Sequence, residues 1–167
     1  MQEARVQVEA KEPINGEIRA SWFTLPINTA QFEEVLGIEE ASDDYYITDK
    51  ELPFADEVRE DMTVAELNDL YDMYLRLPED IRRQYKAFLA YYENLTELSV
   101  YRNLIIPYPN CYSMIDVAKQ KLANEPTFKH LSEDCQEYYF DYEAYASHLQ
   151  EHGKFVQTEY GIYELPE

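Results

Sequence analysis

Glycine, cysteine and histidine are scarce in this chain, and their scarcity argues against most catalytic sites. Four glycines in 167 residues leave no Gly-rich phosphate loop, and no Gly-x-Ser-x-Gly turn is present. We interpret Cys111 and Cys135 as free thiols and small apolar residues, since two cysteines make no disulfide framework. His148 and His152 share a helical spacing but lack the His-Glu-x-x-His pattern, which favours a surface or structural role. The sequence therefore predicts no enzyme, no cofactor and no metal site.

Long apolar segments are missing as well. No stretch approaches the roughly 20 apolar residues of a membrane-spanning helix, and residues 1–20 contain no apolar core of a signal peptide. We therefore expect a cytoplasmic protein without a membrane partner.

Positive charge is the third scarcity. Fourteen Lys and Arg residues face 34 Asp and Glu residues, so the net charge is −20, whereas a small domain usually carries a net charge of magnitude about 2–8. Such an excess repels nucleic acid and anionic membranes and attracts basic surfaces or cations. We therefore expect no direct nucleic-acid binding. Hydrophobic residues still make up 46% of the chain and aromatic residues 14%, which is typical of a folded protein.

Hydrophobic periodicity and turn residues predict elements of both kinds along the chain. The first part has expected strands over 5–10, 17–25 and 45–51 and an expected helix over 30–36. The middle part has expected helices starting at the Thr63–Glu66 capping box and over 79–94 and 96–101. The last part has an expected edge strand over 104–108, a helix over 113–124, two helical stretches within 132–153, and a hairpin of 154–158 and 162–165.

This order predicts an α+β fold in which small lobes follow one another along an elongated chain. The three lobes are a β-rich acidic N-terminal lobe (1–62), a helical middle lobe (63–103) and a mixed α/β acidic C-terminal lobe (104–167). Charge follows the same division. Sixteen acids and 5 bases give a net of −11 through residue 62, residues 63–105 carry only −2, and the remainder carries −7.

The stretch "SDDYYITDKELPFADEVREDM" (42–62) combines eight carboxylates with core-forming residues. Because side chains alternate along a strand, residues 45, 47 and 49 are expected on one face and residues 46, 48 and 50 on the other. The carboxylates are expected mainly on the wet side.

A solubilising surface is the simplest interpretation of this charge, but its size suggests more. Duplex DNA carries about two charges per base pair, so 20 net charges match about ten base pairs. One hypothesis is therefore that the protein imitates DNA toward a groove that binds phosphates. The predicted acidic surface consists of Glu33, Glu34, Glu39, Glu40, Asp43, Asp44, Asp49, Glu51, Asp56, Glu57, Glu60, Asp61, Glu133, Asp134, Glu137, Asp141 and Glu143.

Five segments make a more specific resemblance. They are "GEIRASWFTLPI" (16–27), "YYITDKELPF" (45–54), "TVAELNDLYDMYLRLPE" (63–79), "FDYEAYASHL" (140–149) and "GIYEL" (161–165). In order and spacing the chain resembles the ArdA antirestriction proteins over about residues 5–165. The first loop, "VEAKEPING", differs from the family's usual opening.

The resemblance implies an elongated, three-lobed DNA mimic. Such a protein inhibits type I restriction-modification enzymes by occupying their DNA-binding groove. It also implies a homodimer in the cytoplasm of a bacterial host, encoded on conjugative plasmids or transposons and protecting incoming DNA.

Two other classes stay open at the level of sequence. The acidic faces are also compatible with an interaction module that binds another basic DNA-binding or defence protein. A metal-dependent hydrolase would use acidic residues, but the sequence offers no ligand set for it.

Overall fold

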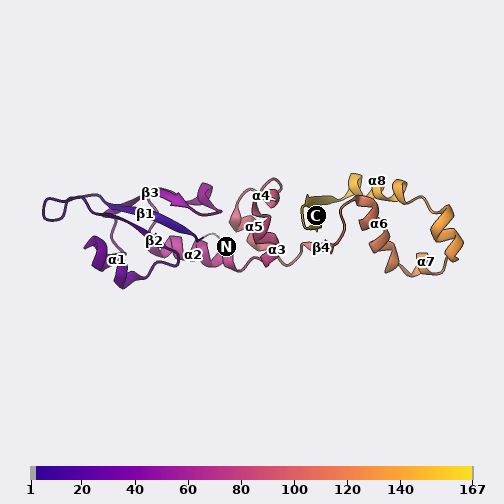
Figure 1. Ribbon diagram of the computed structural model, residues 1–167, viewed down its shortest axis with the longest axis horizontal. Coiled ribbons are helices and arrows are strands. Elements are labelled where there is room, and N and C mark those ends of the chain that lie inside the picture. The colour runs from indigo at the N-terminus through magenta and orange to yellow at the C-terminus, as the bar shows by residue number, and fades with distance from the viewer. Residues whose placement is uncertain (1–2, 167) are drawn as a thin grey trace. The chain divides into compact units, whose positions relative to one another are not determined.

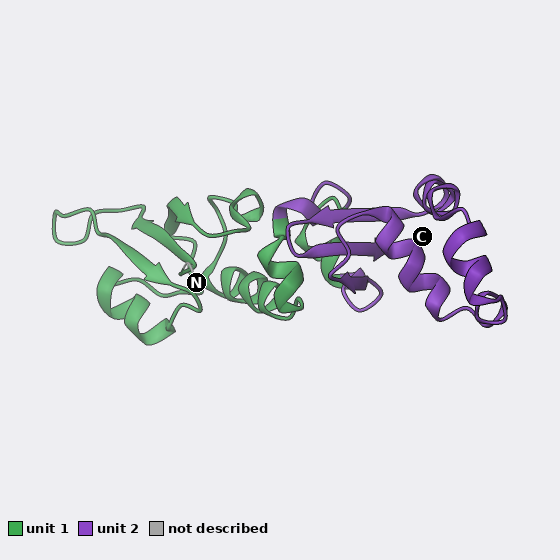
Figure 2. Cartoon of the chain, turned by 45° about the vertical axis from the view of Figure 1, so that its right-hand side comes forward, with its two compact units in different colours: residues 1–85, 92–99 green, residues 86–91, 100–167 purple. Residues whose placement is uncertain are grey.

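The computed structural model describes residues 3–166, which form two compact units (Figure 2). Of the described residues, unit 1 contains 3–85 and 92–99, and unit 2 contains 86–91 and 100–166. Helices and a small antiparallel sheet occur in each, so the predicted α+β class is confirmed. The division into three lobes stays a prediction. Within residues 3–166, no helix is both long enough and apolar enough to cross a membrane.

Three antiparallel strands form the sheet of unit 1, in the order β2-β1-β3 (Figure 1). They are β1 (Arg5–Ala10), β2 (Ala20–Thr24) and β3 (Tyr45–Glu51). Along β1 the side chains of Val6, Val8 and Ala10 are buried, and those between them are half-exposed. β2 is shorter than the predicted strand over 17–25, because Glu17 instead pairs with Ile14 in the preceding turn.

A β-bulge interrupts the pairing of β1 with β3. Val8 lies opposite Ile47 but Gln7 lies opposite Asp49, so Thr48 is left out of the register. Residues that face each other in an antiparallel pair point to the same side. One extra residue therefore moves every later side chain of β3 to the other face. Asp49 shares the outer face with Gln7, and the expectation that it lies on the face of Ile47 is wrong.

Helix α1 (Thr29–Leu36) covers this sheet and begins and ends as its sequence predicts. The side chain of Asn28 accepts a hydrogen bond from the N–H of Gln31 (3.0 Å), and Gly37 ends the helix at φ 72°. Phe32 is fully buried, and its ring centroid lies 4.9 Å from that of Tyr45 on β3. The aromatic residues of the acidic stretch thus build the core of unit 1.

Helix α2 (Val64–Leu75) starts at the predicted capping box. The Glu66 N–H donates to the Thr63 hydroxyl oxygen (3.2 Å). The Val64 N–H donates to the Tyr45 hydroxyl (2.9 Å), which in turn donates to the carbonyl of Glu40. One buried tyrosine therefore connects β3, the loop before it and the first turn of α2.

The predicted helix over 79–94 is wrong, because the chain breaks there into shorter pieces. Helices α3 (Glu79–Arg83) and α4 (Tyr85–Phe88) are followed by a turn and by α5 (Leu95–Tyr101). Ile81 and Tyr85 belong to unit 1, whereas Phe88 belongs to unit 2 and its ring lies 5.2 Å from Tyr163. One straight helix cannot deliver a single apolar stripe to two separate cores. A short 3-10 helix, Ala55–Glu57, precedes α2 and was not predicted.

Unit 2 contains a second antiparallel sheet, in the order β4-β6-β5. Its strands are β4 (Ile106–Pro109), β5 (Lys154–Thr158) and β6 (Gly161–Leu165). The predicted terminal hairpin and the predicted edge position of β4 are both confirmed. The edge position suits Pro107, because proline cannot donate a ladder hydrogen bond.

The helices of unit 2 are α6 (Met114–Ala123), α7 (Pro126–Lys129), a π-helix (Cys135–Tyr139) and α8 (Tyr142–His152). Ser113 and Asp141 cap α6 and α8, and their side chains accept from Asp116 N–H and Ala144 N–H. α6 packs against α8 around a core that includes Val117, Ala146 and Ile162. The predicted free thiols are confirmed: Cys111 is buried in this core, and Cys135 is half-buried.

Candidate acidic binding surface

The structure places almost all of the seventeen predicted carboxylates at the surface. Every one except Glu40 and Glu57 belongs to an exposed residue, and these two are half-buried. Twelve of the seventeen lie in unit 1 and five lie in unit 2. The surface is therefore described as an N-terminal acidic cluster (33–61) and a C-terminal acidic cluster (133–143).

The β-bulge gives the N-terminal cluster its strand carboxylates. Asp49 and Glu51 lie opposite Gln7 and Arg5, on the outer face of the sheet. Glu51 accepts from Arg5 (2.6 Å), and the Arg5 guanidinium lies 4.6 Å above the ring of Trp22. Arg5 thus neutralises one carboxylate while it remains stacked on β2, whereas Asp49 projects without a basic partner among the described residues.

The loop between α1 and β3 holds a second group of carboxylates in a fixed turn. The Ser42 hydroxyl donates to the carbonyl of Glu39 (2.7 Å), and the Lys11 N–H donates to the carbonyl of Asp44 (2.8 Å). The backbone carbonyls of Glu39 and Asp44 therefore accept hydrogen bonds within the fold, while the side chains of Asp43 and Asp44 stay exposed. The loop can present charge without first becoming ordered.

A shallow hollow beside β3 brings further charges together. Glu60 and Asp61 line it with Tyr46 and Lys11. The carboxylate of Glu9, which the sequence did not single out, raises the pKa of Tyr46, with smaller contributions from burial and from Glu60. Tyr46 is therefore held in a negative field, which a cationic side chain would relieve.

Glu57 is the exception in the N-terminal cluster. Its carboxylate accepts a hydrogen bond from the N–H of Leu95, the first residue of α5. Burial raises the pKa of Glu57, and the hydrogen bond from Leu95 partly opposes that rise. This carboxylate holds two segments of unit 1 together rather than adding to the exposed charge.

The C-terminal cluster surrounds the π-helix. Glu133, Asp134, Glu137 and Glu143 are exposed, and Asp141 caps α8 while remaining exposed. Lys119 lies nearby, with its ammonium 5.3 Å from the ring of Tyr142. A hollow of about 430 Å³ is lined by Lys119, Glu133, Gln136, Glu137 and Tyr142.

Few of these charges are compensated. Within residues 3–166, only Glu51 and Asp61 of the seventeen form an ion pair, with Arg5 and Arg59. Both pairs are exposed, and exposed pairs contribute only about 0–1 kcal/mol. Each cluster therefore presents negative charge that is largely uncompensated by basic side chains.

Comparison with protein families decides where the chain belongs. The family model described as antirestriction protein (ArdA) matches residues 14–164 of the 167. The chain belongs to the ArdA antirestriction family. This membership implies an antirestriction function. No curated protein matches the chain.

The segments that carry the ArdA resemblance hold the fold together. The Asn68 side chain accepts from the Ile27 N–H (2.7 Å) and donates to the Ile27 carbonyl (3.0 Å). It thereby ties "TVAELN" to "FTLPI". In "FDYEAY", Asp141 caps α8, Tyr142 packs on Phe140 (5.0 Å), and Ala146 beyond it lies in the core. The family segments therefore supply capping, hydrogen-bonding and packing contacts of the fold.

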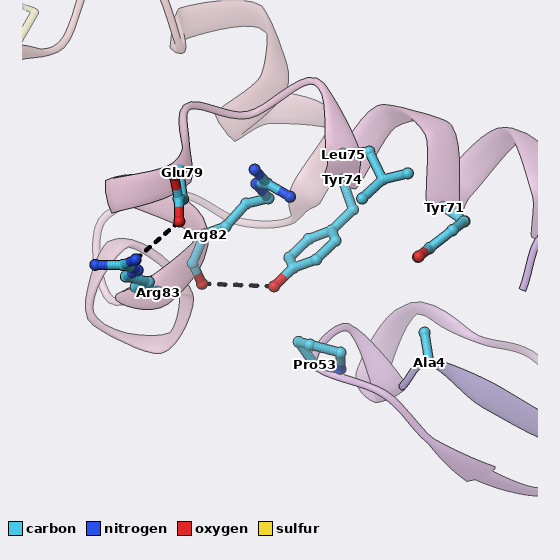
Figure 3. A pocket seen from close by; sticks show the side chains of 8 residues that line it. All are labelled: Ala4, Pro53, Tyr71, Tyr74, Leu75, Glu79, Arg82 and Arg83. Carbon is cyan, nitrogen blue, oxygen red and sulfur yellow. Dashed lines mark hydrogen bonds and ion pairs between the residues drawn. The ribbon is translucent and has the colours of Figure 1, made fainter. Parts of the chain in front are cut away.

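A pocket of about 550 Å³ lies in unit 1 of this ArdA chain (Figure 3). Glu79, the one carboxylate among the described residues that line it, pairs with Arg83 (2.8 Å), and the Tyr74 hydroxyl donates to the Arg82 carbonyl (3.5 Å). Its lining consists of Ala4, Pro53, Tyr71, Tyr74, Leu75, Glu79, Arg82 and Arg83. This set contains no nucleophile with an adjacent base.

Two neighbouring histidines of the ArdA chain bear on metal binding. The rings of His148 and His152 lie 4.4 Å apart on α8. Among the described residues, no three His, Cys, Asp or Glu side chains come together as a metal site.

Sequence reasoning missed a pair of side chains within the C-terminal cluster. Tyr138 and Tyr139 are 69% and 80% exposed, more than any other large hydrophobic residue described. The sequence does not distinguish these two exposed tyrosines, because Tyr is abundant throughout the chain. The aromatic residues beside them, Phe140 and Tyr142, pack inward. The outward pair ends the π-helix, and Phe140 follows it directly in an extended conformation.

Proposed function

We propose that this ArdA-family protein is a DNA mimic that occupies the DNA-binding groove of type I restriction-modification enzymes and so protects incoming mobile DNA. The observation that carries the proposal is the set of fifteen exposed carboxylates, of which only Glu51 and Asp61 are ion-paired among the described residues. A groove that binds phosphates with Lys and Arg gains counterion release from such a surface as it does from DNA.

The proposal includes the partners and the setting. The protein acts as an inhibitor without catalysis or a cofactor, in the cytoplasm of a bacterial host, and it acts as a homodimer. Net charge supports its preference for a protein partner, since a chain of net charge −20 is repelled by nucleic acid and by anionic membranes.

A plating experiment tests the antirestriction activity. Unmodified phage is plated on a host with an active type I restriction enzyme, with and without expression of the protein. We expect rescue of plating. Absence of rescue by soluble, abundant protein would contradict the proposed target.

A competition experiment tests the mechanism. The purified protein is titrated against a type I enzyme bound to a fluorescent unmethylated duplex, at two salt concentrations. We expect displacement of DNA that weakens as salt rises, because the contacts are ionic.

The charge itself is tested by a variant of four exposed sites. Asp43→Asn, Asp44→Asn, Glu60→Gln and Asp61→Asn together remove four charges from the N-terminal cluster. The control, Asp69→Asn, Asp72→Asn, Glu79→Gln and Glu93→Gln, removes four exposed charges from the nearly neutral middle of the chain, where Asp72 and Glu79 are ion-paired with Arg76 and Arg83. We expect weaker displacement from the first variant only. Equal displacement by both would contradict mimicry by these clusters.

The alternative is an acidic module for a different basic DNA-binding or defence protein. The competition experiment distinguishes this alternative from the proposed DNA mimic. Such a module would leave the type I enzyme bound to DNA while displacing DNA from its own partner.

A further inference from the structure

The exposed tyrosine pair of unit 2 is the feature that the acidic charge does not explain. Tyr138 and Tyr139 lie on the π-helix at 69% and 80% exposure. Two adjacent aromatic rings held in water forgo the hydrophobic stabilisation that burial would give. π-helical turns are rare and occur frequently at functional sites.

Contacts of neighbouring residues hold the backbone on both sides of these two tyrosines. The Gln136 side-chain amide donates to the carbonyls of Phe128 (3.0 Å) and Leu131 (3.1 Å), and the Tyr142 hydroxyl donates to the Gln136 carbonyl (2.8 Å). On the other side of the pair, Phe140 packs edge-on against Phe128 with centroids 5.0 Å apart. The chain is therefore anchored on both sides of residues 138 and 139, so little backbone freedom remains to be lost on binding.

The surroundings of the pair select the chemistry of its partner. Glu133, Asp134, Glu137, Asp141 and Glu143 are all exposed, and none forms an ion pair within the described chain. A second copy of this chain would bring five more carboxylates against these five, and an anionic lipid surface or nucleic acid would likewise be repelled. A cationic partner is attracted, and aromatic faces bind Arg and Lys favourably. Lys119 shows this contact on the same surface, 5.3 Å from the ring of Tyr142.

We infer that Tyr138 and Tyr139 are contact residues on which arginine or lysine side chains of the partner's phosphate-binding groove stack, while the surrounding carboxylates pair with neighbouring cations. The inference rests on the proposed function, and it assigns to the C-terminal cluster a contact that DNA phosphates do not make. Guanidinium groups stack on flat aromatic faces as well as pairing with anions. The tyrosine rings would therefore add stacking contacts for cations beside the carboxylates that replace phosphates.

The test is the same competition against a type I enzyme bound to a fluorescent duplex, now with variants of the pair. Tyr138→Leu and Tyr139→Leu, singly and together, keep an apolar side chain but remove the ring. Tyr138→Phe with Tyr139→Phe keeps both rings. Tyr112→Leu, at a tyrosine that is 62% exposed elsewhere in unit 2, is the control for loss of an exposed ring. Thermal melting of each variant establishes that the fold is intact, and the single variants serve if the double leucine variant melts early.

We expect the double leucine variant to bind about tenfold or more weakly, and each single variant several-fold more weakly. The double phenylalanine and Tyr112→Leu variants should match the parent. The dependence of affinity on salt should be unchanged, because no charge is altered. If the double leucine variant binds as tightly as the parent, the inference is wrong. It is also wrong if the double phenylalanine variant loses as much affinity as the double leucine variant. Neither result contradicts the proposed function. Failure of the parent protein to compete overturns both the inference and the proposed function.

Discussion

At the scale of single residues, Glu57 shows how one carboxylate of an acidic stretch can serve the fold. It lies only three residues from the exposed Glu60, yet its side chain accepts a hydrogen bond from Leu95, 38 residues away. The sequence of residues 42–62 does not distinguish Glu57 from its neighbours. The distinguishing contact is long-range, and periodicity and composition report only local preferences.

The raised pKa of Glu57 makes a prediction about pH. Because burial raises its pKa in the native state, the native state binds this proton more readily than the unfolded chain does. The resulting stability is present below the ordinary pKa of Glu and is lost as pH rises through the raised pKa. Glu57→Gln, which resembles the protonated form, should therefore lose less stability than the parent between pH 4 and pH 7 in urea denaturation.

Two further variants complete this measurement. Glu60→Gln removes an exposed charge from the same stretch and controls for net charge. Glu57→Ala should lose roughly 1 kcal/mol or more at all pH values, because the Leu95 N–H loses its acceptor. Identical pH profiles for the parent and Glu57→Gln would contradict this account.

At the scale of elements, the helix ends and the alternation of side chains along strands could be predicted from local sequence. Asn28, Thr63, Ser113 and Asp141 cap helices as their side chains and positions predict. The β-bulge at Thr48 and the break of the predicted helix after Arg83 could not be predicted, because neither site contains the Gly or Pro that would indicate it. Both depend on which surfaces a segment must pack against, and that information lies outside the segment.

Gly161 is the element-scale position where substitution should be most costly. It begins β6 at φ 137°, and a Cβ built there would lie 3.0 Å from the carbonyl oxygen of Tyr108 on β4. Gly161→Ala should therefore lose roughly 1–3 kcal/mol from backbone strain, and the contact with β4 should add to that loss. Chemical denaturation of the full chain measures the difference.

Gly16 supplies the matched control, because it also has a positive φ, of 84°, but no heavy atom lies within 4 Å of its added Cβ. Gly16→Ala should lose only about 1–2 kcal/mol, from the backbone conformation alone. Equal losses at the two positions would mean that the contact with Tyr108 has no effect.

At the scale of the whole molecule, charge imbalance acts on folding and on binding in opposite directions. A net charge of −20 opposes compaction through self-repulsion. Sequence alone predicted that the carboxylates would be exposed, because burying unpaired charge is too costly. It could not predict which carboxylates line a common hollow, or that Glu57 is half-buried and hydrogen-bonded. Both features depend on tertiary contacts, such as those of Tyr46 and Leu95.

Salt should therefore stabilise the fold while it weakens the proposed complex. We expect the melting temperature to rise by about several degrees between 10 mM and 500 mM sodium chloride, since the Debye length falls from about 30 Å to a few Å. The four-site variant of the N-terminal cluster should show a smaller rise, because it carries less repulsion. A melting temperature that is constant or falls with salt would contradict a fold under electrostatic self-repulsion.

The outer edge of β4 has a consequence for how the protein behaves when concentrated. Pro107 and Pro109 alternate along this four-residue edge strand, and neither has a backbone N–H to offer an incoming strand. On the opposite edge, the Tyr91 hydroxyl already donates to the carbonyl of Phe155 on β5. The β4 edge is therefore a poor template for fibril growth, a hazard of open sheets. The small sheet of unit 2 can leave this side open without offering an incoming strand a full set of ladder hydrogen bonds.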